Sequence, residues 1–177
     1  MKKLYATDLL FTSTPEQVSR LLKLDQTNSE SWHAEDLRSM VRHQMAAPLS
    51  FDLGSIPLSP AEQKTAAETL AQATRSDIPT FGDLFQTEHP PIELLKLCQK
   101  FFKQNAMSHP KGSPEQQVGY LFYLLSIVTA RVRTGINPSK LSDADQLHGI
   151  QSILDRAWID EPIRQLLVQG QRRIAAG

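Results

Sequence analysis

The stretch from Ser113 to Thr134 constrains the fold of this chain more than any other. It contains thirteen consecutive residues, Val118 to Ala130, without a single charged side chain. Apolar residues cover most of its circumference at helical spacing, and a helix of that kind belongs inside a bundle with other helices around it. The uncharged run falls short of the roughly 20 apolar residues that a membrane span needs. The stretch therefore predicts a buried central helix and no membrane segment.

Local signals mark both ends of this helix. Ser113 can cap the first free amides, and Pro114 suits the first helical position. Arg131 and Arg133 stand where cations favour the negative end of the helix dipole, and Gly135 follows as a stop signal. The predicted helix therefore covers residues 113–134.

Apolar residues at helical spacing predict further helices along the chain. We expect them at 15–24, 33–46, 60–75, 91–107 and 143–156 and after Asp160, with a short helical turn at 80–85. Residues 49–58 alternate like a strand, but no second strand is available to pair with them, so we interpret them as an extended connector. The sequence thus predicts an all-α fold of about seven helices.

The domain organisation leaves two arrangements open. In the first, residues 90–177 form a four-helix bundle around the central helix, and residues 1–89 form a helical arm joined by a hinge at 76–91. In the second, all 177 residues form one continuous domain, for which the chain is long enough.

Composition limits the expected partners and the expected cellular compartment. Nineteen basic and nineteen acidic residues balance, so no net field attracts nucleic acid or an anionic membrane. A single cysteine, Cys98, rules out an intrachain disulfide and any multi-cysteine zinc site, which favours a reducing, cytoplasmic setting. Thr7 and Asp8 interrupt the first apolar stretch, so no secretory signal peptide is expected.

The motifs of common catalytic and phosphate sites are absent. The sequence has no GxGxxG, no GxxxxGK and no GxSxG, and no two of its five histidines stand three or four residues apart. We therefore expect no cofactor and no bound metal. The alternative of a small hydrolase or transferase depends on dispersed polar residues such as Glu115, Asp145 and His148. Cys98 lies on an apolar helix face, where a thiol is usually inert.

Two short segments, residues 6–11 and 80–85, share a cap residue, an aspartate, leucine and phenylalanine. Both are hypothesised either to dock on the helical body of the chain or to bind a partner. Two tryptophans are further candidates, because this residue is enriched in interface hot spots. Trp32 follows a polar loop and is expected on the surface, whereas Trp158 precedes a helix and is expected mainly in the core. The candidate interaction residues are Leu9, Leu10, Phe11, Trp32, Leu84, Phe85 and Trp158.

Lys96, Lys100 and Lys103 form a basic stripe at positions i, i+4 and i+7 of one predicted helix. We interpret the stripe as the solvated face of an amphipathic helix. A nucleic-acid-binding protein normally has a stronger basic bias together with a recognition helix or an aromatic platform. Nucleic acid is therefore not the expected partner, and a role as a nucleic-acid accessory protein is the third of three functional hypotheses.

The leading functional hypothesis is a non-enzymatic, cytoplasmic helical module that binds a protein partner or a second copy of itself. It depends on the several amphipathic helices, on the alanine-rich face of helix 60–75 and on the two Leu-Phe segments. The small enzyme is the second hypothesis.

Overall fold

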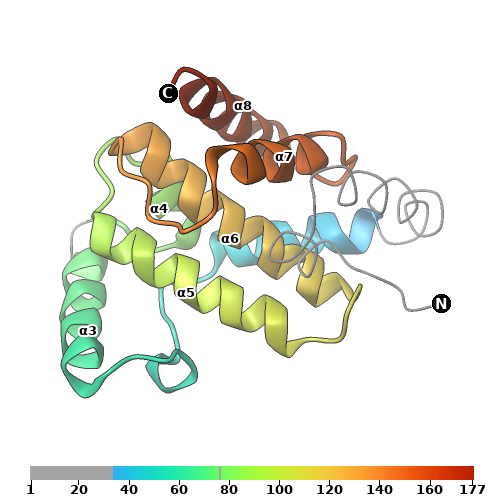
Figure 1. The fold of residues 1–177 in the computed structure, drawn as a ribbon. Helices are drawn as coiled ribbons and strands as arrows, with labels where there is room; N and C mark the ends of the chain where they lie inside the picture. Colours follow the sequence, from blue (N-terminus) through green and yellow to red (C-terminus); the bar gives the residue numbers. More distant parts are fainter. Residues whose placement is uncertain (1–33, 76) are drawn as a thin grey trace.

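The computed structural model describes residues 34–75 and 77–177, and its regular structure in this part is helical (Figure 1). Residues 34–46 are helical, followed by the 3₁₀ turn η1 (Leu53–Ser55), α3 (Pro60–Arg75), α4 (Phe81–Gln86), α5 (Ile92–Ser108), α6 (Pro114–Arg133), α7 (Asp143–Leu154) and α8 (Glu161–Ala175). No strand occurs in the described residues. The predicted all-α class is confirmed, and the predicted helix 15–24 lies outside the described part.

The central helix is the one predicted from the uncharged run. Every residue of α6 from Val118 to Arg131 is buried, and Figure 1 shows α5 on one side of it and α7 and α8 on the other. The Ser113 hydroxyl accepts a hydrogen bond from the Gln116 backbone N–H at 3.2 Å, as the predicted cap requires. The chain therefore builds its core around one helix that is apolar on all sides.

Glycines mark positions where neighbouring helices approach α6 closely, and Gly119 and Gly170 are two of them. A Cβ atom on Gly119 of α6 would lie 3.2 Å from the Cα and Cβ of Ala106 in α5. A Cβ on Gly170 of α8 would lie only 2.4 Å from a methyl carbon of Val128. Gly119 therefore marks a close helix crossing.

The six phenylalanines of the described part form one connected aromatic cluster. Phe51 precedes η1, Phe81 and Phe85 belong to α4, Phe101 and Phe102 to α5, and Phe122 to α6. Their ring centroids lie between 4.9 and 5.9 Å apart in successive contacts, within the range of favourable aromatic pairs. This cluster packs α4 and the connector against α5 and α6.

The start of the connector at 49–58 lies beside the segment that precedes α4. Pro48 forms an isolated antiparallel bridge with Thr80. The Leu49 N–H donates to the Pro79 carbonyl at 2.8 Å, and the Phe81 N–H donates to the Ala47 carbonyl at 3.3 Å. These contacts involve only the start of the connector, and no strand forms in the described residues. The interpretation of 49–58 as a connector without a strand partner therefore stands.

The helix at 34–46 contacts the bundle through two buried apolar side chains and through hydrogen bonds of two arginines. Arg42 donates two hydrogen bonds to the Asp160 carboxylate, at 2.8 and 3.0 Å, and Arg38 donates to the Ala157 carbonyl at 2.6 Å. Leu37 and Val41 on the same helix are buried. The Arg42 hydrogen bonds are the main reason why the pKa of Asp160 lies below its usual value.

Buried residues from both predicted halves belong to one hydrophobic cluster, which extends from Leu37 to Ile174. The predicted hinge at 76–91 supplies several buried members of that cluster, among them Ile78 and Phe81. The boundary near residue 89 and the hinge stay predictions, and the alternative of one continuous domain is the one that this packing favours.

Helix α3 contributes only small side chains to the fully buried core. The predicted thin face includes Ala66, Ala67 and Leu70, but Ala67 is exposed. Ala66 and Ala73 are buried instead, and Leu70 packs partly against the core. Helix α3 is therefore rotated slightly from the predicted orientation.

Candidate functional site: the groove between α3 and α5

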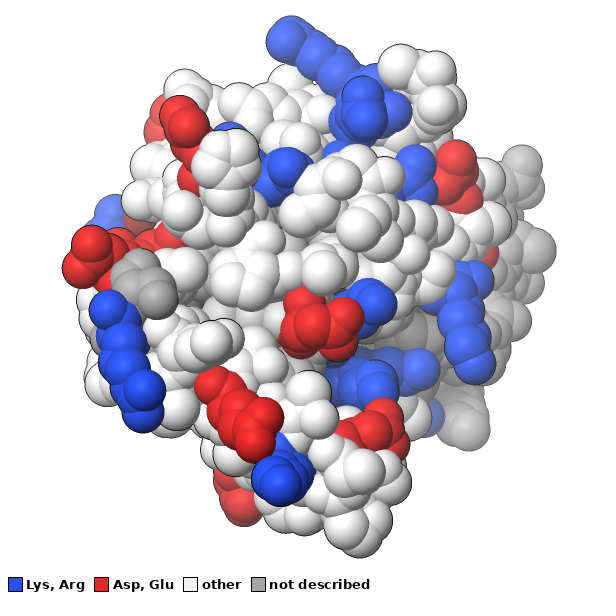
Figure 2. Space-filling model, turned by 90° about the vertical axis from the view of Figure 1, so that its left-hand side faces the viewer, with Lys and Arg blue, Asp and Glu red and all other residues white. Residues whose placement is uncertain are grey.

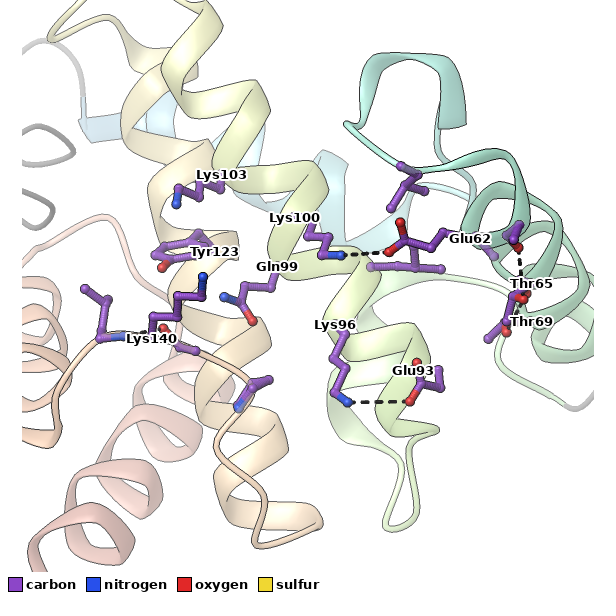
Figure 3. Close-up of a pocket in the computed structure, with 17 residues that line it drawn as sticks. Glu62, Thr65, Thr69, Glu93, Lys96, Gln99, Lys100, Lys103, Tyr123 and Lys140 are labelled. Carbon is purple, nitrogen blue, oxygen red and sulfur yellow. Dashed lines mark hydrogen bonds and ion pairs between the residues drawn. The ribbon is translucent and has the colours of Figure 1, made fainter.

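A groove of about 720 Å³ lies between α3 and α5. The loop at 138–141, which follows α6, and Tyr123 of α6 complete its lining (Figure 3). Its apolar lining residues come from four segments and are Leu58, Ala61, Ala66, Leu97, Pro138 and Leu141. On α3 the lining includes the small side chains of Ala61 and Ala66, which leave space between the two helices.

Four lysines line this groove, and three of them are the predicted basic stripe. Lys96, Lys100 and Lys103 are exposed on α5. Lys140 enters from the loop after α6, and Figure 3 shows it near Tyr123. The sequence could not have placed Lys140 beside the stripe, since no periodicity connects a loop residue with a helix forty residues earlier.

Two glutamates balance part of this charge. The Lys96 Nζ lies 3.5 Å from the Glu93 carboxylate, and the Lys100 Nζ lies 3.6 Å from the Glu62 carboxylate on α3. Among the described lining residues, four lysines stand against two glutamates, a surplus of two positive charges. The groove therefore has a cationic rim and an apolar interior.

Glu62 has a second role as the cap of α3. Its carboxylate accepts a hydrogen bond from the Ser59 N–H at 3.0 Å, and the Ser59 hydroxyl accepts one from the Glu62 N–H at 3.2 Å. The capping box lowers the pKa of Glu62 mainly through the Ser59 hydrogen bonds, and the nearby Lys100 charge adds to this effect. Glu62 is thus ionised at neutral pH and fixed at the start of α3.

Tyr123 occupies the end of the groove where α5 and the 138–141 loop meet. Burial raises its pKa above the usual value, and hydrogen bonds with Ser139 and Gln99 oppose that rise. The hydroxyl therefore stays protonated at neutral pH. Figure 3 shows Lys103, Gln99 and Lys140 around it. This end of the groove combines positive charge with hydrogen-bonding groups.

The surrounding surface carries both signs of charge. Figure 2 views the molecule from the side that lies at the left of Figure 1, where α3 is located. Basic and acidic side chains alternate over this face with uncharged areas between them. It does not present the continuous basic surface that tracks a nucleic-acid backbone.

The structure places the other candidate interaction residues elsewhere. Leu84, Phe85 and Trp158 are only 0%, 1% and 2% exposed, so they belong to the core and offer no surface to a partner. For residues 80–85, this burial agrees with the alternative in which the segment docks on the helical body of its own chain. Leu9, Leu10, Phe11 and Trp32 lie outside the described residues.

The dispersed polar residues of the enzyme hypothesis belong to different helices, α6 and α7. Glu115 lines a separate hollow with His43 and His109, whereas Asp145 and His148 belong to α7. No group of three or more potential metal ligands occurs in residues 34–75 and 77–177. Cys98 is fully buried, and this burial raises the pKa of its thiol well above the usual 9.0.

Within the described part of the chain, no helix combines the length and the apolar character that crossing a bilayer requires. Comparison of the chain with protein-family models, with curated proteins and with solved structures finds no match.

Proposed function

We propose that this chain is a non-enzymatic cytoplasmic interaction module that binds an acidic, partly apolar segment of a partner protein in the groove between α3 and α5. The observation that supports this proposal is the combination of an apolar interior with a surplus of lysine at the rim. Acidic side chains of an amphipathic segment would meet the lysines while its apolar face enters the groove.

The chemistry of the groove favours a peptide over nucleic acid. Glu62 and Glu93 stand in the lining beside Lys100 and Lys96, and their carboxylates would repel a phosphate backbone. The apolar residues of the groove would also gain nothing from phosphates and sugars. An acidic segment with leucine or isoleucine anchors satisfies both parts of the lining.

Self-association is the other form of the same hypothesis. Residues 1–89 carry eight basic and twelve acidic groups, and residues 90–177 carry eleven basic and seven acidic groups. This opposite surplus would favour head-to-tail contact between copies. Sedimentation velocity over a range of concentrations, at low and high salt, tests whether copies associate in this way.

Fluorescence anisotropy with designed peptides tests the proposal directly. The probe is a labelled amphipathic peptide with leucines at i, i+3, i+4 and i+7 and glutamates on the remaining face. One control peptide has lysine in place of glutamate, and a second control is polyglutamate. We expect saturable binding of the probe only, because it alone carries both features that the groove complements.

A matched pair of charge reversals locates the binding. Lys140→Glu places a negative charge in the groove and should weaken probe binding by about tenfold, which corresponds to ~1.4 kcal/mol. Lys64→Glu makes the same change at an exposed α3 position outside the groove lining and should change binding little. Equal effects of the two variants, or tighter binding of a thymidine oligonucleotide than of the peptide, would contradict the proposal.

A further inference from the structure

A second, smaller pocket of about 280 Å³ lies between α4, α6 and α8. Its apolar lining includes the buried side chains of Phe85, Leu125 and Leu166. This volume is slightly below the range of about 300–1,000 Å³ that is usual for drug-sized ligands. The pocket therefore suits a small ligand with an apolar part.

Among the described lining residues, the charged group is Arg133, in the last turn of α6. Arg131, the other arginine in this turn, donates a hydrogen bond to the Asp143 carboxylate at 2.9 Å and forms an ion pair with it. Arg133 has no such carboxylate among the described residues, and its Nε is buried there without a hydrogen-bond partner. A shielded guanidinium nitrogen without an acceptor costs free energy, and a bound acceptor would remove that cost.

The remaining polar lining is neutral. Gln86, Gln165 and Gln169 line the pocket, and no carboxylate occurs among its described lining residues. The Gln165 amide nitrogen lies 3.5 Å from the Glu161 carboxylate, at the outer limit of a hydrogen bond, so it is only weakly engaged. Glutamine amides add hydrogen-bond donors and bring no negative charge that would compete with an anion.

We propose that this pocket binds a small monocarboxylate with an apolar tail. A guanidinium presents a planar pair of N–H donors that matches the two oxygens of a carboxylate. The glutamine amides can donate to the same oxygens, while the tail lies against Phe85 and Leu125. The site is separate from the α3–α5 groove, and its proposal does not depend on the function proposed for that groove.

Isothermal titration calorimetry of the full chain with hexanoate and 3-phenylpropionate tests this site. Hexanamide and hexylamine are the controls, since they keep the tail and replace the anion by a neutral or cationic group. We expect saturable binding of the two carboxylates and at least about tenfold weaker binding of both controls, in line with the loss of a charge-assisted hydrogen bond. An acetylated tripeptide that ends in leucine offers the same carboxylate on a larger body and should bind more weakly than hexanoate.

Three variants assign the binding to Arg133. Arg133→Gln should weaken hexanoate at least about tenfold, whereas Arg172→Gln, an exposed position outside the pocket lining, should leave it unchanged. Gln169→Glu keeps the arginine and adds a carboxylate at an exposed lining position, so it should also abolish tight binding without disturbing the core. Circular dichroism melts confirm that each variant is folded. Absence of saturable carboxylate binding, equal binding of hexanamide, unchanged binding in Gln169→Glu or tighter binding of the tripeptide would each overturn the proposal.

Discussion

At Gly170, α8 lies too close to the central helix to accommodate a side chain without a shift. Its missing side chain leaves room for Val128, which is fully buried and, as a β-branched residue, has little rotamer freedom in a helix. We expect Gly170→Ala to lower the free energy of unfolding by about 1–3 kcal/mol, the usual cost of overpacking a core. The helix propensity of alanine opposes this loss by at most ~1 kcal/mol. Urea denaturation followed by circular dichroism measures the difference.

The control for Gly170→Ala is Gln169→Ala, an exposed change to the same residue in the same helix, which should alter stability by no more than about 0.5 kcal/mol. Combining Gly170→Ala with Val128→Ala should recover part of the loss, because the second change removes the methyl groups that the new Cβ meets. A Gly170→Ala protein more stable than the original would contradict the close crossing.

The burial of Cys98 should make the free energy of unfolding depend on pH. Burial raises the pKa of its thiol above 9.0 in the folded chain, so the folded state holds this proton more tightly than the unfolded state. Its contribution to stability is therefore complete at neutral pH and is lost as the pH rises past 9.0. Cys98→Val should make the stability less dependent on pH between 8 and 10, as measured by urea denaturation at each pH.

A thiol reagent gives an independent measure of the same burial. The folded protein should react slowly with Ellman's reagent at pH 8, and the protein in urea should react at once. Rapid reaction of the folded protein would show that the α5 face around Cys98 opens readily.

At the scale of elements, α4 is a short plug in the core. Its six residues are too few to form a stable helix alone, and the Thr80–Asp83 capping box and the buried Leu84 and Phe85 hold it in place. We expect Phe85→Ala to cost about 3–5 kcal/mol and Leu84→Ala about 2–5 kcal/mol of unfolding free energy. Gln86→Ala, an exposed change in the same helix, is the matched control, and all three are compared by chemical denaturation.

The partner-binding alternative for residues 80–85 predicts a different effect of these substitutions on stability. If Leu84 and Phe85 bound a partner, their replacement by alanine would leave stability unchanged and reduce only binding. A stability loss in both variants with none in Gln86→Ala agrees with a plug. Unchanged stability would contradict the burial that the structure shows.

Elements whose signals are local could be predicted from the sequence. The ends of α6 follow from Ser113 and the last-turn arginines, and the start of α3 follows from Ser59 and Glu62, because a cap needs only residues within one turn. The rotation of α3 could not be predicted, since alanines on adjacent faces give almost no hydrophobic contrast. The bridge between Pro48 and Thr80 and the approach of Lys140 to Tyr123 arise from tertiary packing, which leaves no periodic pattern in either segment.

The candidate site likewise has features that could be predicted from the sequence and features that could not. The stripe of Lys96, Lys100 and Lys103 could be predicted from helical spacing, including its exposure. The groove could not, because it exists only where α3 packs on α5 and where the loop after α6 closes one end. The Leu-Phe pattern at 84–85 was ambiguous for a physical reason: an apolar pair that binds a partner and one that fills the core have the same composition.

At the scale of the whole molecule, the aromatic cluster joins the two predicted halves of the chain. Phe102 and Phe122 of the predicted C-terminal bundle contact Phe81 and Phe85, which precede the predicted boundary at residue 89. Removing residues 1–89 would expose these buried rings to water and leave the face of α6 that α4 covers without a partner. We therefore expect a fragment of residues 90–177 to be less stable and to bind the dye ANS, a sign of loosened packing.

The full chain should unfold in a single cooperative transition, with far-UV circular dichroism and near-UV aromatic signals changing together in urea. Two separate transitions, or a fragment 90–177 with a sharp melt and no ANS binding, would instead establish the arm and the bundle as independent domains. The outcome also bears on the groove, since α3 precedes the boundary whereas α5 and Lys140 follow it. If the two halves form one cooperative unit, a ligand that bridges α3 and α5 stabilises the whole fold by mass action. At the same peptide concentration, the probe peptide should then raise the melting temperature of the full chain more than that of Lys140→Glu.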